Sequence, residues 1–152
     1  RPNTDNSMTC GYPGTFRWAS VHAVNGTIQT SDSRDKNTVV NSVLGLDFIK
    51  ALRTVSYKFN IGKNVVKYDE NGEKIVTPIA GTRNHFGLIA QEVQSVIPEG
   101  VDFGGWILTD TGDTLSPQGL RYDQFVAPLI KAIQELSAKN DALEARLTAA
   151  GL

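Results

Sequence analysis

Hydrophobic positions in the C-terminal part of the chain recur in alternating steps of three and four residues. Such spacing is typical of a heptad seam, in which the first and fourth positions of each repeat face a partner helix. Lys139 and Glu144 flank the seam, where neighbouring chains can form a salt bridge. We therefore expect a coiled-coil helix over about residues 121–152. The seam consists of Val126, Leu129, Ile133, Leu136, Asn140, Leu143, Leu147 and Ala150.

The polar member of this seam, Asn140, favours a partner helix, because a lone polar residue among core positions is a known device for fixing register and oligomer state. The alternative, a single amphipathic helix that lies on its own domain, stays open on the pattern alone. The pattern also leaves the number of strands open, since Ile and Leu at these positions favour dimers as readily as trimers.

The middle of the chain combines short helical and strand patterns, which together predict an α+β head. Residues 41–52 read as a short helix weakened by Gly45, and its expected buried face is formed by Leu44, Phe48, Ile49 and Leu52. Asn71-Gly72, between two β-branched flanks, is the strongest hairpin signal. The other predicted elements are strands within residues 55–60, 64–78 and 85–90, a helix at 91–97 stopped by Pro98, and a second hairpin at 105–115.

Residues 16–30 alternate loosely between apolar and polar side chains, with a break at Asn25-Gly26. This pattern predicts short strand pieces. Such a segment is too small to bury its own apolar side chains, so it must pack on another chain or on the domain that follows. The segment is therefore an early indication of oligomerisation.

Composition narrows the classes of function. The chain has 152 residues, 40% of them hydrophobic, which suffices for one sizeable core. Its 15 basic and 16 acidic residues give a net charge of -1, and no apolar run approaches the ~20 residues of a membrane span, so we expect neither nucleic acid nor membrane as a partner.

The residue types that bind metals are scarce. Cys10 is the only cysteine, and His22 and His85 are the only histidines. We therefore expect no metal and no cofactor. Four carboxylates offer too few ordered acidic positions for a calcium loop, namely Glu99, Asp102, Asp110 and Asp113.

The segment from Thr30 to Lys36 (TSDSRDK) offers one possible chemistry. The hydroxyl of Ser31 can attack the carbonyl of the peptide bond before it, and Lys36 can accept the proton if its amine is neutral. An ordinary lysine titrates at about 10.4, so burial or a neighbouring cation must favour the neutral form. Residues five apart face each other neither on a helix nor on a strand. A dyad therefore requires a bend between Ser31 and Lys36, or partners from different chains.

Three blocks in order give this chain a familiar outline: SDSRDK at 31–36, GLIAQEV at 87–93 with Pro98-Glu99 nearby, and YDQFVAPLIKAIQEL at 122–136. From Ser31 to Leu152 the chain resembles the intramolecular chaperone domain of endosialidases, tailspikes and phage tail fibres. The self-cleaving domain of the myelin regulatory factor is similar to the same family.

The resemblance implies a self-cleaving serine peptidase that acts once. Ser31 would be the nucleophile, Lys36 the base, and Thr30 would supply the scissile carbonyl. By the same resemblance Asp32 and Arg34 shape the turn. Gln91 and Glu92, in the second block, are candidates for holding the serine loop, and the alternative is that they cap and solvate the N-terminus of a helix. Asp35 departs from the family, in which the position before the lysine is often apolar.

The architecture implied is a short N-terminal β segment of a fibre shaft (1–30) followed by a chaperone and autocleavage domain (31–152). The latter comprises the α+β head and the helix of a trimeric coiled coil. We expect a homotrimer whose folding client is the upstream fibre, formed in the host cytoplasm. The fibre would remain in the virion tail and the chaperone would be released. A non-cleaving trimerisation or receptor-binding tip is the alternative. The related domain of a membrane-tethered transcription factor is less favoured, because residues 1–30 lack basic character.

Overall fold

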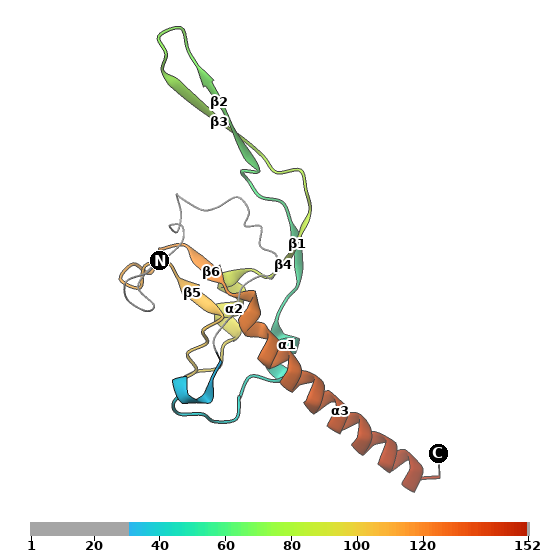
Figure 1. The fold of residues 1–152 in the computed structure, drawn as a ribbon. Coiled ribbons are helices and arrows are strands. Elements are labelled where there is room, and N and C mark those ends of the chain that lie inside the picture. Colours follow the sequence, from blue (N-terminus) through green and yellow to red (C-terminus); the bar gives the residue numbers. More distant parts are fainter. Residues whose placement is uncertain (1–30, 152) are drawn as a thin grey trace.

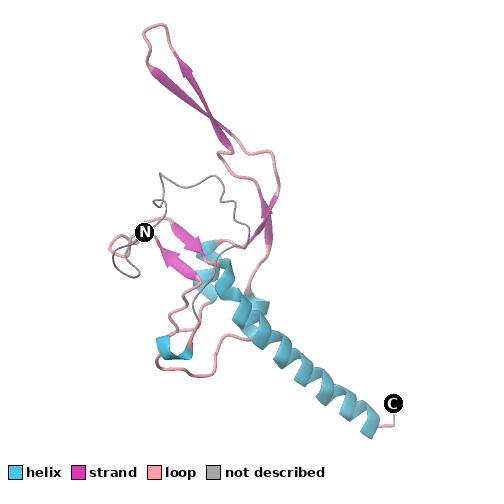
Figure 2. Ribbon diagram, viewed as in Figure 1, coloured by secondary structure: helices cyan, strands magenta, loops and turns pink. Residues whose placement is uncertain are grey.

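The computed structural model describes residues 31–151, and the predicted strand pieces within 16–30 lie outside this range. Short helices, three small sheets and a long C-terminal helix confirm the α+β class (Figures 1 and 2). The elements are η1 (Ser33–Asp35), α1 (Leu46–Ala51), β1 (Val55–Tyr57), β2 (Lys63–Tyr68), β3 (Lys74–Ile79), β4 (His85–Gly87), α2 (Ala90–Val96), β5 (Trp106–Leu108), β6 (Gln118–Leu120), η2 (Tyr122–Phe125) and α3 (Val126–Ala149).

The core of the head lies where α1, α2 and the start of α3 meet. Phe103 packs edge-to-face on Phe48 of α1, with ring centroids 5.5 Å apart, and on Phe125 of η2, at 5.1 Å. This geometry suits the charge distribution of aromatic rings. Val93 of α2 and Leu44 complete the buried cluster. The rings thus join elements that are far apart in the sequence.

The strands form three separate antiparallel pairs, β1 with β4, β2 with β3, and β5 with β6. The β2–β3 hairpin projects from the head as an arm (Figure 1). The predicted turn at Asn71-Gly72 is confirmed: Gly72 has a φ of 80°, which glycine adopts without strain. The carboxylate of Asp69 accepts the N–H groups of Asn71 and Glu73, at 2.9 and 2.8 Å, and fixes the turn.

The second predicted hairpin is present, but its boundaries were wrong. β5 pairs with Gln118–Leu120, beyond the predicted end at 115, because the connecting loop is longer. Its aspartates fold the loop: Asp110 accepts the N–H of Gly112 at 2.8 Å, and Asp113 accepts that of Leu115 at 2.9 Å. These carboxylates therefore serve as turn residues.

Helix α1 begins at Leu46 and ends at Ala51, so it is shorter than the predicted helix at 41–52. Its first amide is capped from a distant element: Glu135 of α3 accepts the N–H of Leu46 at 2.8 Å. Lys131 forms an ion pair with Glu135 at 2.8 Å. A Cβ on Gly45 would lie 2.6 Å from the carboxylate oxygens, so glycine permits this approach. The predicted buried face of this segment is confirmed by the burial of Leu44 and Phe48.

The link between α1 and α3 predicts an acid-sensitive contribution to stability. The hydrogen bonds from Lys131 and then from the Leu46 amide lower the pKa of Glu135 below 4.5. A lowered folded-state pKa gives stability that is complete above the unfolded-state pKa and lost as pH falls through the folded value. Glu135→Gln keeps a carbonyl acceptor but loses the charge. We expect it to unfold at lower urea concentration than wild type at pH 7, and the difference to vanish toward pH 3.

Glu70→Gln, an exposed change in the arm, is the matched control and should show no such pH-dependent difference. A deficit of Glu135→Gln that stays constant from pH 7 to pH 3 would contradict the role of the charge.

Candidate active site

The chain bends sharply after Ser31 and brings two candidate catalytic side chains together. Residues 33–35 form η1, which is one turn of 3-10 helix. The Asp35 N–H donates a hydrogen bond to the Asp32 carbonyl (3.2 Å), and the Lys36 N–H donates one to the Ser33 carbonyl (3.3 Å). Across this turn Nζ of Lys36 lies 2.6 Å from Oγ of Ser31. The bend that a dyad within one chain requires is therefore present.

Asp32 and Arg34 hold the turn. The Asp32 carboxylate accepts three hydrogen bonds from Arg34: from the backbone N–H at 2.9 Å, from Nε at 3.0 Å and from Nη2 at 2.7 Å. The first caps η1, and the other two are the bidentate pairing that a planar guanidinium favours. The Arg34 side-chain hydrogen bonds lower the pKa of Asp32, and that pairing raises the pKa of Arg34.

The dyad loop, residues 31–43, lies on the outside of the single chain, and every residue in it is exposed. Thr38 has a φ of 51°, which is unusual for a β-branched residue and turns the chain again just after Lys36. Three valines follow with their side chains largely in solvent: Val39, Val40 and Val43, at 77, 80 and 71% exposure. Within residues 31–151 this apolar stretch is thus left largely unburied.

The other candidate support residues lie elsewhere. Gln91 is exposed at the start of α2. Glu92 receives hydrogen bonds from Nε of Arg53, at 3.0 Å, and from its Nη2. The structure thus links Glu92 to the segment between α1 and β1. Thr30, the proposed donor of the scissile carbonyl, lies outside the described residues.

His85 and Trp106, which the sequence also singled out, take part in packing. His85 stacks on Tyr57 and packs edge-on against Phe59, at the base of the arm. Trp106 packs against the core and donates its indole N–H to Gln118 at 3.0 Å. Within residues 31–151 no cluster of three potential metal ligands occurs.

Helix α3 presents two different faces. Pro128 and Ala132 are buried, and Glu135 on the same face caps α1. The predicted seam lies about 100° around the helix from this buried face, given 3.6 residues per turn, and it faces solvent. Beyond the head, α3 extends freely (Figure 1). The exposed seam residues are Val126, Leu129, Ile133, Leu136, Leu143 and Leu147, each at least 42% exposed. In the part of the chain that the structure describes, α3 therefore packs on the head through the Pro128–Ala132 face and not through the seam.

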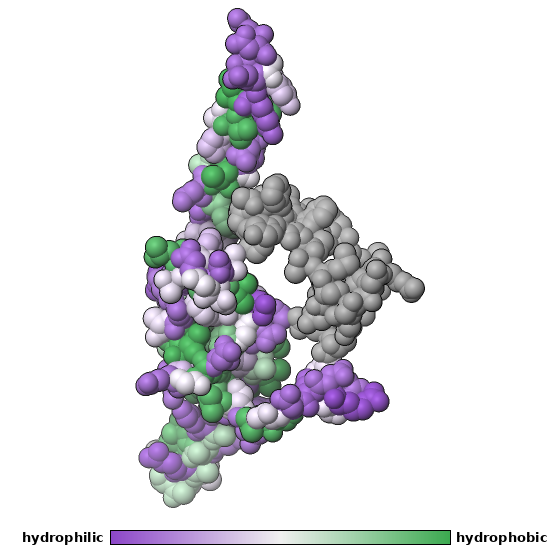
Figure 3. Space-filling view, turned by 90° about the vertical axis from the view of Figure 1, so that its left-hand side faces the viewer, coloured by the Kyte–Doolittle hydropathy of each residue, from purple (hydrophilic) through white to green (hydrophobic). Residues whose placement is uncertain are grey.

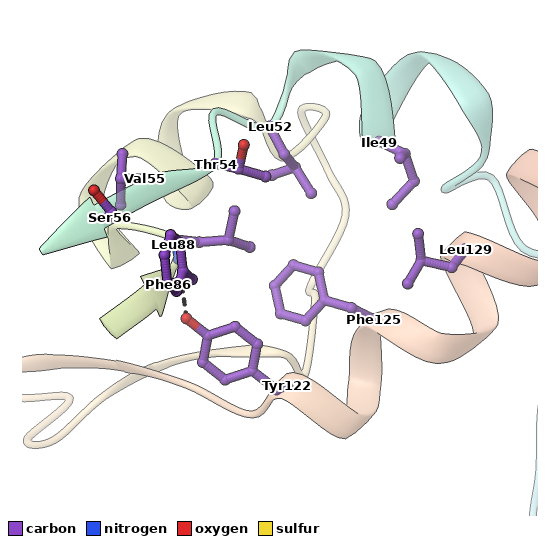
Figure 4. Close-up of a pocket in the computed structure, with 11 residues that line it drawn as sticks. Ile49, Leu52, Thr54, Val55, Ser56, Phe86, Leu88, Tyr122, Phe125 and Leu129 are labelled. Atoms are coloured by element: carbon purple, nitrogen blue, oxygen red, sulfur yellow. Dashed lines mark hydrogen bonds between the residues drawn. The ribbon is translucent and has the colours of Figure 1, made fainter. Parts of the chain in front are cut away.

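An apolar groove of about 620 Å³ adjoins the seam, between β1, β4, α1 and the start of α3 (Figure 4). The Leu88 N–H donates to the Tyr122 hydroxyl at 3.0 Å across one side of it. Phe86, at its edge, is 82% exposed. Leu129 belongs to both groove and seam, so the two form one apolar surface. Figure 3 shows apolar residues reaching the surface over the head and the arm.

Comparison with known families agrees with this arrangement. Residues 31–102 match the model of a peptidase family described as "Chaperone of endosialidase". The match begins at Ser31 and ends before the long helix, whereas the resemblance in sequence extends to Leu152. The match thus begins at the residue after which the chain bends into η1. Residues 31–102 are therefore similar to the chaperone-of-endosialidase family.

No match was found among curated proteins. Among residues 31–151, no helix has the length and apolar character needed to cross a membrane.

Proposed function

We propose that this chain trimerises and folds an upstream phage tail fibre or tailspike, and then releases itself by cutting between Thr30 and Ser31. The observation that carries the proposal is the 2.6 Å approach of Lys36 Nζ to Ser31 Oγ, at the residue where the family match begins. Residues 1–30 would be the end of the fibre, and residues 31–152 the chaperone. Assembly would take place in the host cytoplasm.

The exposed apolar surface supports assembly. Burying a leucine or isoleucine side chain fully is worth about 1.5–3 kcal/mol relative to leaving it exposed. The α3 seam exposes such side chains along one line, and the groove continues this surface onto the head. Helices from three chains would bury the seam and bring three upstream segments into register at high local concentration. Lys139 and Glu144 would pair between neighbouring chains.

Assembly would also favour the neutral form of Lys36 that cleavage needs. In the single chain Lys36 donates its hydrogen bond to the Ser31 hydroxyl. A neutral amine would instead accept the hydroxyl proton at the same separation. Lys36 is exposed in the single chain, and water favours a charged ammonium, whereas burial favours the neutral amine. Packing of the dyad loop in the trimer would therefore activate the pair.

The cleavage is a transfer followed by hydrolysis. Ser31 Oγ attacks the Thr30 carbonyl carbon while Lys36 takes the hydroxyl proton. The peptide C–N bond breaks as the Ser31 nitrogen leaves with a proton from Lys36, and an ester joins Thr30 to the Ser31 oxygen. Water then hydrolyses the ester, each site acts once, and no cofactor takes part. Once the chaperone has left, the fibre is held by its unfolding barrier.

Substitution of the dyad tests the cleavage. We expect wild type to divide into fragments 1–30 and 31–152, while Ser31→Ala and Lys36→Ala stay whole. Lys36→Arg should also stay whole, because arginine keeps the charge and donors but cannot be deprotonated. Intact mass and N-terminal sequencing measure the outcome. A trimeric wild-type chain that stays uncut would favour the non-cleaving tip, and a new terminus other than Ser31 would refute the assigned bond.

Substitution of the seam tests the assembly. Leu143 is half exposed and lies on the seam, where Leu143→Asp would place three charges close together in a trimer. We expect sedimentation to show a trimer for wild type and a shift toward monomer for this variant. Ala145→Asp, two residues away and off the seam, is the matched control and should remain trimeric. Equal masses for both variants would contradict the assigned interface.

A further inference from the structure

The dyad loop contains acidic groups that could oppose its chemistry. Asp32 and Asp35 lie four residues and one residue before Lys36. A carboxylate next to a lysine stabilises the ammonium, and a shift of one pKa unit changes the neutral fraction about tenfold. A loop that uses Lys36 as a base therefore has to keep these carboxylates away from Nζ.

The structure shows how one of them is kept away. Arg34 supplies three donors to Asp32, and its Nε and Nη2 bind both carboxylate oxygens. Among residues 31–151, no carboxylate oxygen lies within the 4.0 Å ion-pair distance of Lys36 Nζ. The hydrogen bond of Lys36 goes to Ser31 instead. The other charged residues of the exposed dyad loop are Asp32, Arg34 and Asp35.

We propose that Arg34 is a positioning residue that sequesters the Asp32 carboxylate, so that Lys36 stays paired with the Ser31 hydroxyl. The inference rests on the proposed self-cleavage and assigns Arg34 a task beyond shaping the turn. Without the guanidinium, Asp32 is free to form an ion pair with Lys36 across the turn. The neutral amine then becomes rarer at a given pH, and cleavage slows.

The test is a cleavage time course of the full chain, synthesised in vitro and followed by intact mass from pH 6 to pH 10. We expect Arg34→Ala to cut roughly tenfold more slowly than wild type at neutral pH, with its rate profile displaced by about one pH unit to the alkaline side. Arg34→Lys should recover part of the rate, because a lysine can still neutralise Asp32.

The decisive variant is the double substitution Asp32→Asn with Arg34→Ala. Asparagine keeps the helix cap but has no charge to trap Lys36. The double variant should therefore cut at close to the wild-type rate, and Asp32→Asn alone at least as fast as wild type. Sedimentation of each variant confirms that it still assembles.

Three outcomes would overturn the inference. Equal slowing of the single and double variants at every pH would give Arg34 a merely structural role. A wild-type rate for Arg34→Ala would give it no role. If all variants and wild type remain uncut, the proposed function itself fails, and this inference with it.

Discussion

Within residues 31–151 most large hydrophobic side chains are left exposed, and this constraint governs the rest of the structure. Among residues 31–151 only six hydrophobic residues are buried, whereas twenty large ones are exposed. Five of the buried residues form one small cluster, centred on three phenylalanines, in the head. Most of the exposed ones lie on the α3 seam, the apolar groove, the arm and the dyad loop. Exposed apolar surface of this extent favours association, which supports the proposed assembly.

The surface that would assemble and the site that would cut are connected through the chain. Lys36 is followed by the exposed valines, and the same segment enters the core at Leu44. Two residues later the Leu46 amide is fixed to Glu135 of α3. The dyad loop is thus joined by a short segment to the helix that carries the seam. Trimerisation through α3 would place this loop and its valines near neighbouring chains, which would desolvate the lysine.

Sequence predicted the features that depend on local pattern. The buried face of α1, the turn at Asn71-Gly72 and the long C-terminal helix follow from periodicity and turn chemistry. The Glu135 cap on Leu46 and the packing of Phe103 on Phe125 could not be predicted, since each depends on tertiary placement. At the site, spacing showed that Ser31 and Lys36 need a bend. The spacing did not predict the 3-10 turn that provides this bend, nor the hydrogen bonds of Arg34 to Asp32, because both depend on the local backbone conformation.

The central claim is that assembly activates a cut between Thr30 and Ser31. The most direct test measures cleavage per chain against protein concentration, across the range in which wild type passes from monomer to trimer. We expect the cut fraction to follow the trimeric fraction and dilute monomer to stay whole. A cleavage rate constant that is unchanged between monomer and trimer would contradict it.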